Sequence, residues 1–82
     1  YGYLCRGRVR LERGELAAAR ADLSTARALG GVMHAPGYRG EVHFGLARAG
    51  GSPLLVAQAI ADFTAAGLPS RVRAVTAWRD SQ

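Results

Sequence analysis

Residues 15–26, ELAAARADLSTA, are matched 40 positions later by residues 55–66, LVAQAIADFTAA. Five of the twelve aligned positions are identical. The pair Asp22 and Asp62 is the most informative, because alanine is abundant in the whole chain. Three further pairs exchange similar side chains, namely Leu16 with Val56, Leu23 with Phe63, and Ser24 with Thr64. The match indicates an internal repeat.

Small and apolar residues in both segments follow steps of three and four, which places them on one face of a helix. They are Leu16, Ala19, Leu23 and Ala26 in the first segment and Val56, Ala59, Phe63 and Ala66 in the second. Ser52 and Pro53 are typical of the N-cap and first position of a helix, and Gly67 is typical of a helix end. We therefore expect each segment to be helical.

Glycines and prolines divide the chain into five pieces of ordinary helix length. The breaks are Gly14, Gly30-Gly31, residues 50–53, and Gly67 with Pro69. Residues 6–11 also alternate in polarity like a strand, but a single strand would have no partner. We expect an all-α domain over residues 1–82, with five helices. Its parts are two antiparallel helix-turn-helix repeat units (about 2–30 and 37–67) and a C-terminal capping helix (about 69–80).

The size and composition of the chain bound its class. At 82 residues and 49% hydrophobic residues, it can form one small packed domain. The longest uncharged run, residues 49–61, is shorter than the roughly 18 residues that span a bilayer, so we expect no membrane segment. The single cysteine, Cys5, excludes an internal disulfide and favours a cytoplasmic location. Because the chain begins with Tyr1 rather than Met, we expect a fragment of a longer protein.

Arginine supplies all 11 basic residues, and the formal net charge is +5 at pH 7. Together with abundant Ala and Gly, this is typical of a GC-rich genome, which would give the charge no functional cause. The alternative is an anionic partner such as DNA, because the guanidinium fork suits phosphate and carboxylate groups. Arginines cluster within residues 6–13 and 71–79, which leaves both explanations open.

The repeat resembles the tetratricopeptide repeat, whose second helix carries an Ala-x3-Phe signature. That signature is matched by Ala19 with Leu23 and by Ala59 with Phe63. Gly7 and Ala47 correspond to the small residue in the first helix of the family, Leu46-Ala47 to its Leu-Gly pair, and residues 14–16 to its turn. The period of 40 exceeds the 34 of the family and leaves a loop over residues 30–37. The chain also resembles helical-repeat regions of large bacterial transcriptional regulators and signalling proteins.

The resemblance implies a non-catalytic module that binds a protein or peptide on a concave face lined by the first helices. Carried over, it places Leu4, Arg8 and Leu11 on that face, with Arg48 as the second-unit counterpart of Arg8. Leu4 and Leu11 are also compatible with plain core positions, which are the commoner role for leucine. Arrays of this kind usually need about three units. Self-association or packing on further sequence is therefore an additional expectation.

The alternative function is DNA binding through a helix-turn-helix formed by residues 54–80. Arg71 and Arg73 would open its recognition helix, where base and phosphate contacts are made. However, Phe63 stands four residues before the turn glycine Gly67, where such motifs need a small residue for close helix crossing.

Chemistry-bearing residues are sparse. His34, His43 and Cys5 do not match a known metal-ligand spacing, and the glycine pairs lack the lysine of a phosphate-binding loop. No Gly-x-Ser-x-Gly element marks a nucleophilic serine. We therefore expect no enzymatic activity, no metal site and no cofactor.

Overall fold

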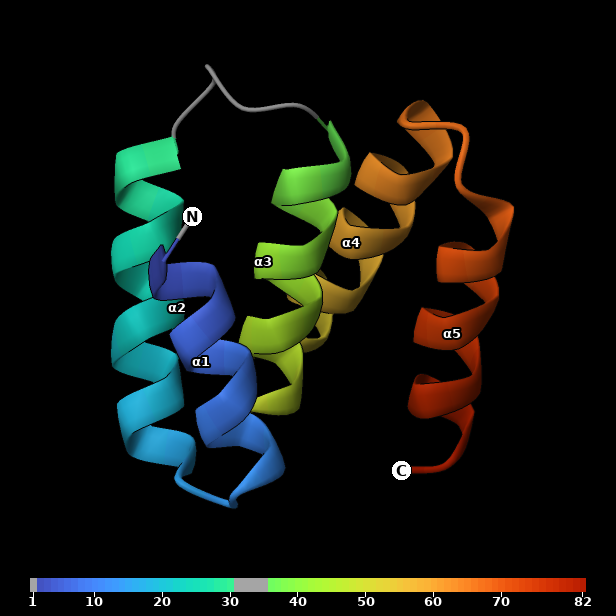
Figure 1. Cartoon of the computed structure of the whole chain (residues 1–82). Helices are drawn as coiled ribbons and strands as arrows, with labels where there is room; N and C mark the ends of the chain where they lie inside the picture. The colour runs from blue at the N-terminus through green and yellow to red at the C-terminus, as the bar shows by residue number, and fades with distance from the viewer. Residues whose placement is uncertain (1, 31–35) are drawn as a thin grey trace.

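A computed structural model describes residues 2–30 and 36–82, and in these ranges it contains five α-helices and no strand. The helices are α1 (Gly2–Glu12), α2 (Leu16–Gly30), α3 (Pro36–Arg48), α4 (Pro53–Ala65) and α5 (Pro69–Asp80) (Figure 1). The predicted all-α fold of five helices is confirmed. The alternating stretch 6–11 lies within α1 and is helical. His34 and most of the predicted 30–37 loop lie outside the described residues.

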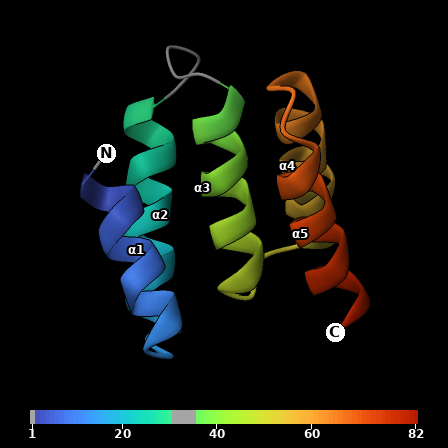
Figure 2. The same cartoon turned by 45° about the vertical axis from the view of Figure 1, so that its right-hand side comes forward.

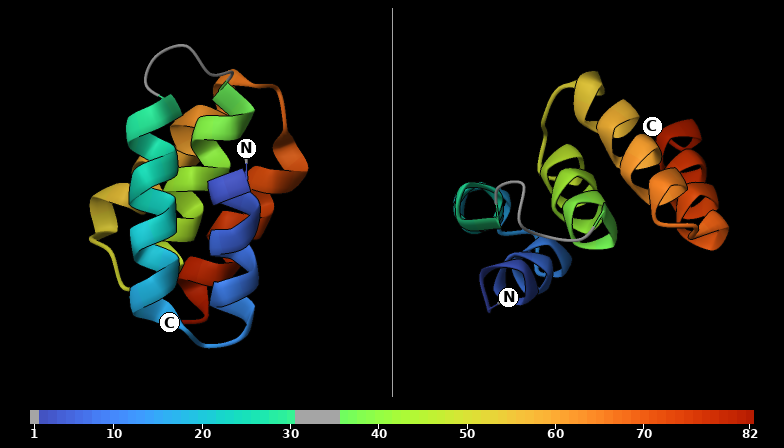
Figure 3. Two further views of the ribbon diagram at one scale, coloured as in Figure 1. Left: turned by 60° about the vertical axis from the view of Figure 1, so that its left-hand side comes forward. Right: turned by 90° about the horizontal axis from the view of Figure 1, so that it is seen from above.

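The helices form two antiparallel hairpins and a final single helix. The α1–α2 hairpin contacts the α3–α4 hairpin mainly through α2 and α3, and α5 packs on α4. In Figure 2 the pair α1–α2, the central α3, and the pair α4–α5 stand side by side. Seen from above (Figure 3), α1, α3 and α5 lie toward one side of the molecule, and α2 and α4 lie toward the other.

Three helices end in the same backbone conformation, a glycine C-cap. Gly14, Gly50 and Gly67 follow α1, α3 and α4, and each has a positive φ, of 79°, 93° and 70° respectively. The residue after each glycine then donates its N–H to the carbonyl oxygen five positions back. This hydrogen bond gives a partner to one of the carbonyl groups that the end of the helix leaves unpaired. These bonds are Glu15 to Arg10, Gly51 to Leu46, and Leu68 to Phe63. Glycine is needed at these turns because a Cβ disfavours this conformation.

Each hairpin is closed by a large apolar side chain that lies on a glycine. A Cβ atom added at Gly7 would lie 2.8 Å from Cγ of Leu23, and one added at Gly40 would lie 2.6 Å from Cε1 of Phe63. Leu23 and Phe63 are both completely buried. Leu23 also contacts the next hairpin, where a Cβ at Gly45 would lie 2.8 Å from its Cδ1. The glycines therefore allow the close approach of α1 and α3 to their partner helices.

These contacts correct the predicted register of the repeat. Gly7 and Gly40 occupy equivalent places and are 33 residues apart, whereas Leu23 and Phe63 are 40 apart. Ala47 is therefore not the counterpart of Gly7. The surrounding residues agree, because RGRVR at 6–10 matches RGEVH at 39–43. The stretch from the glycine to the large apolar residue is seven residues longer in the second hairpin, and the extra residues are shared among the end of α3, the turn and the start of α4.

The paired aspartates of the repeat, Asp22 and Asp62, each contact two residues at equivalent positions of the preceding helix. The carboxylate of Asp22 accepts hydrogen bonds from Nε and Nη2 of Arg6, at 2.9 and 2.8 Å, and its Oδ2 lies 3.0 Å from Nη1 of Arg10. Arg6 and Arg10 are four residues apart on α1, so both side chains are on the helix face that lies against Asp22. In the second hairpin the equivalent contacts are Asp62 to His43 Nδ1 at 2.6 Å and to Arg39 Nε at 3.6 Å.

Asp22 is nearly inaccessible to solvent, with 4% of its surface exposed. The hydrogen bonds from Arg6 lower the pKa of Asp22 below its ordinary value, and the charges of Arg10 and Arg6 add to this effect, while desolvation opposes it. A carboxyl group with a lowered pKa in the folded state stabilises the fold above its unfolded pKa. That stabilisation is lost as the pH falls through the folded pKa.

We predict that the free energy of unfolding decreases as the pH drops below about 4, because the unfolded chain then binds a proton at Asp22 that the folded chain excludes. Asp22→Asn should be less stable at neutral pH and should lose less stability on acidification. Urea unfolding followed by the fluorescence of Trp78 measures both. Asp80→Asn, which removes an exposed carboxylate, is the control. An Asp22→Asn variant with the acid sensitivity of the wild type would contradict the prediction.

We also predict that Gly40→Ala lowers the free energy of unfolding by about 1–2 kcal/mol, since the gain in helix propensity only partly offsets the clash with Phe63. Gly2→Ala, a helical glycine with no atom within 4 Å of an added Cβ, should leave stability unchanged or slightly raised. Adding Phe63→Leu to Gly40→Ala should recover part of the loss. Equal stability of the two alanine variants in urea unfolding would refute the close contact.

Candidate functional site

A cavity of about 500 Å³ lies on the side of the molecule formed by the first helices. We call it the three-helix cavity, because α1, α3 and α5 all contribute to its lining. Its lining residues are Leu4, Arg8, Gly37, Tyr38, Glu41, Phe63, Leu68, Ser70 and Arg71. The volume is within the range of small-ligand and peptide side-chain pockets.

Glu41 of α3 lies between two arginines in this cavity. Nη2 of Arg71 donates a hydrogen bond to Oε1 of Glu41 at 2.6 Å, whereas Nη1 of Arg8 lies 3.8 Å from Oε2. The first distance is that of a strong charge-assisted hydrogen bond, and the second is too long for a hydrogen bond. One carboxylate therefore faces two guanidinium groups, and the local charge is positive.

Arg71 is held in place from several sides. Its guanidinium carbon lies 5.4 Å from the ring centre of Phe63 and 5.7 Å from that of Phe44, within the range of cation–π attraction. Its Nε is buried and has no hydrogen-bond partner among the residues that the structure describes. Half of the Arg8 side chain is exposed, against 36% of that of Arg71. Arg8 is therefore the more available of the two cations.

The remaining lining is largely apolar. Leu4 and Phe63 belong to the buried core, and Leu68, in the turn between α4 and α5, is partly exposed. Gly37 of α3 lies close to Leu68, where an added Cβ would approach its Cδ1 to 3.4 Å. The cavity thus presents apolar surface beside a positively charged group, an arrangement that suits an amphipathic ligand.

The structure brings together some of the sequence-predicted residues. Leu4 and Arg8 line the cavity, although Leu4 is also a core residue with 3% of its surface exposed. Leu11 is buried in the core beside α2 and is not among the lining residues. Arg48 lies over the ring of Phe44, with its guanidinium carbon 5.4 Å from the ring centre.

Arg48 is not the structural counterpart of Arg8. Gly7 of α1 and Gly40 of α3 make equivalent contacts and are 33 residues apart. The same offset of 33 residues makes Glu41 the counterpart of Arg8. Arg48 stands seven residues after Glu41, about two turns further along the same stripe of α3. Arg48 is therefore on the same face of α3 as Glu41, but it lies at the C-terminal end of that helix, outside the cavity.

Arg71 and Arg73 do not act on a common surface. Arg71 lines the three-helix cavity, whereas Arg73 is exposed beside a different hollow lined by residues such as Thr64 and Val72. Residues two apart on a helix point in nearly opposite directions. The pair is thus poorly placed for joint contacts in one DNA groove.

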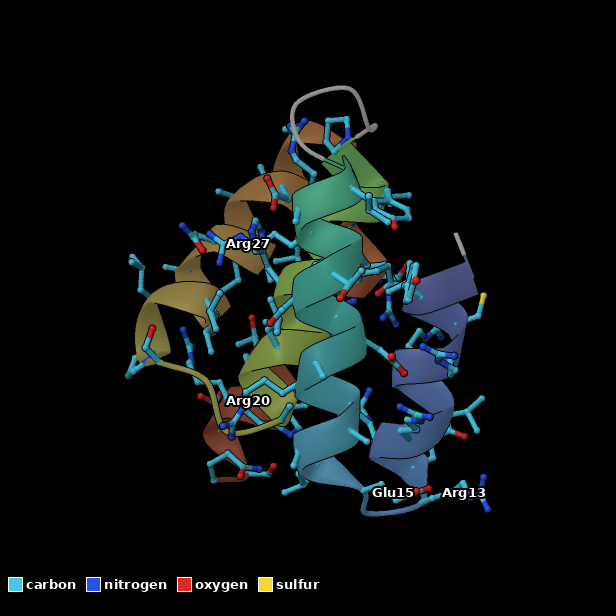
Figure 4. The ribbon with its side chains drawn as sticks, turned by 90° about the vertical axis from the view of Figure 1, so that its left-hand side faces the viewer. Arg13, Glu15, Arg20 and Arg27 are labelled. Atoms are coloured by element: carbon cyan, nitrogen blue, oxygen red, sulfur yellow. The ribbon has the colours of Figure 1, made fainter. Side chains whose placement is uncertain are left out.

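The arginines of the α2 face are also dispersed (Figure 4). Arg13 lies beside Glu15 at the α1–α2 turn, 3.4 Å from its carboxylate, and Arg20 donates to the carbonyl of Ala49 at 2.7 Å. Arg27 lies higher along α2, exposed to solvent. Across the described residues, at least seven of the eleven arginines lie at salt-bridge distance from a carboxylate. Much of the basic charge is therefore locally balanced.

Sequence reasoning missed Glu41, the residue at the centre of the cavity. The signal that could have found it is the RGRVR and RGEVH match, which places Glu41 where the first unit has Arg8. His43, considered as a metal ligand, is paired with Asp62 instead. Within residues 2–30 and 36–82, no group of three His, Cys, Asp or Glu residues could hold a metal ion.

None of the helices in the described part of the chain has both the length and the apolar character to cross a membrane. No family profile, curated protein or solved structure matches the chain.

Proposed function

We propose that this chain is a non-catalytic helical-repeat module that binds a segment of a protein or a peptide in the three-helix cavity. The observation that carries the proposal is the composition of the cavity, which combines side chains from α1, α3 and α5 around an arginine that is half exposed. Such convergence of apolar walls and a few polar groups is typical of binding sites.

The stacking of the hairpins supports this function. Repeat arrays use the surface lined by one helix of each unit to bind extended partners. Here the cavity is lined by residues of α1 and α3, the first helices of the two hairpins, together with residues of α5. The origin in a bacterial regulatory or signalling protein rests on the sequence resemblance alone and stays a prediction, as does the cytoplasmic location.

We predict that peptides selected on this chain from a random phage-displayed library bind at least about fivefold more weakly to Arg8→Ala, because the variant removes the exposed cation of the cavity. Arg48→Ala should weaken binding less, since Arg48 lies outside the lining residues, and the double variant should fold normally and bind weakest. Fluorescence anisotropy measures the affinity, and circular dichroism checks the fold.

Arg27→Ala is the matched control, because it removes an exposed arginine from α2, away from the cavity. Its affinity for the selected peptides should equal that of the wild type. Unchanged binding by a folded Arg8→Ala variant would remove the three-helix cavity as the binding site. Equal losses in Arg8→Ala and Arg27→Ala would mean that net charge, not the cavity, attracts the peptides.

Binding to a generic DNA duplex at low and at physiological salt separates this function from the DNA-binding alternative. We predict that any binding disappears at physiological salt, because the arginines are dispersed and many are paired with carboxylates. Binding that persists at physiological salt, and that Arg71→Ala and Arg73→Ala both weaken, would instead support the helix-turn-helix function.

A further inference from the structure

The three-helix cavity contains more positive than negative charge, and its hydrogen-bonding groups are unequally used. Arg71 is bonded to Glu41 at 2.6 Å and lies against two aromatic rings. Arg8 has only the 3.8 Å approach to the same carboxylate, and half of its side chain is exposed. A guanidinium has five N–H donors, and those of Arg8 are not engaged by a hydrogen bond within the described residues.

We infer that the cavity recognises an acidic side chain of the bound segment, with an aliphatic side chain beside it. This inference rests on the proposed peptide-binding function and names the chemistry of the ligand. Arg8 is the residue that pairs with the ligand carboxylate. The guanidinium fork matches a carboxylate in a two-point contact that a neutral amide cannot reproduce.

Arg71 is already engaged, which leaves Arg8 for the ligand. Cation–π contacts with Phe44 and Phe63 hold Arg71, and Arg71 in turn holds Glu41 by a hydrogen bond. The carboxylate of Glu41 lies 3.8 Å from Arg8, so it competes with a ligand carboxylate for Arg8 without forming a close pair. With a ligand carboxylate bound, the cavity would contain two carboxylates and two guanidinium groups, so its positive and negative charges would balance.

The aliphatic part of the ligand follows from the rest of the lining. Leu4 and Phe63 form apolar surface in the cavity, and Leu68 is partly exposed at its edge. An aliphatic side chain next to the acidic one would cover this surface from water, which favours binding roughly in proportion to the area buried. A fully acidic segment would leave this part of the cavity unfilled.

Two other features were weaker candidates for a ligand site. The hollow beside Arg73 is lined by the α4–α5 turn and has only that one charged residue. The hollow formed by Gly2, Tyr3, Arg6 and Leu29 contains a cation that is already bonded to Asp22. In neither does an unengaged charged group lie beside buried apolar surface.

The test uses two pools of peptides with blocked ends and randomised flanks. One pool has a fixed Leu-Glu-Leu centre and the other a fixed Leu-Gln-Leu centre, so that only the charge differs. In NMR titrations of the whole chain, we expect the Glu pool to shift the amide signals of cavity residues such as Gly37 and Ser70, and to bind about fivefold more tightly than the Gln pool. Salt should reduce this preference.

Variants test the individual roles. Arg8→Gln should abolish the preference for the Glu pool, so that the two pools bind with equal affinity. Arg73→Gln, which removes the same charge outside the cavity, should keep the preference. Glu41→Gln removes the carboxylate that competes for Arg8, so we expect it to bind the Glu pool about fivefold more tightly than the wild type does. A gain of binding cannot result from misfolding.

The possible failures are distinguishable. If both pools shift the cavity signals with equal affinity, the peptide-binding function stands and the acidic preference is wrong. If neither pool shifts those signals, both the function and the preference are wrong. A preference for the Glu pool that persists in Arg8→Gln but is lost in Arg73→Gln would assign the carboxylate to another surface, and it would overturn the role of Arg8.

Discussion

The contact between a large apolar side chain and a glycine is the constraint on which the rest of this structure depends. Leu23 on Gly7 and Phe63 on Gly40 set the separation and the register of both hairpins. The register then places Arg6 and Arg10 against Asp22, and Arg39 and His43 against Asp62. Two side chains spaced i and i+4 on the first helix of a hairpin both reach one aspartate of the second helix only when the two helices have this register. Between the two hairpins, Glu41 of α3 lies near Arg8 of α1, and this approach forms part of the charged lining of the three-helix cavity.

Several features of the fold were predictable from the sequence because they depend on local chemistry. Pro53 and Pro69 begin α4 and α5, since proline suits the first turn of a helix, and Gly14, Gly50 and Gly67 end the helices that precede them. Leu23 and Phe63 stood out as equivalent large residues in an alanine-rich pattern, and both are fully buried.

The register of the first helices and the composition of the candidate site were not predicted. A single offset of 40 aligns α2 with α4 but misaligns α1 with α3, because the stretch from Gly40 to Phe63 has seven more residues than the stretch from Gly7 to Leu23. The error made Arg48 the counterpart of Arg8 and hid Glu41. A carboxylate on a helix is usually a solvated surface group, so its place between two arginines emerges only when three helices are assembled.

Leu23 has a further consequence, because it touches Gly7 in its own hairpin and Gly45 in the next. Separating the two hairpins would expose a residue that also closes the first one. Loss of the contact between the hairpins therefore weakens the contact within the first hairpin. The first four helices are thus expected to unfold cooperatively rather than one hairpin at a time. In repeat proteins the balance between unit stability and interface stability sets this cooperativity. Here one leucine contributes to both terms.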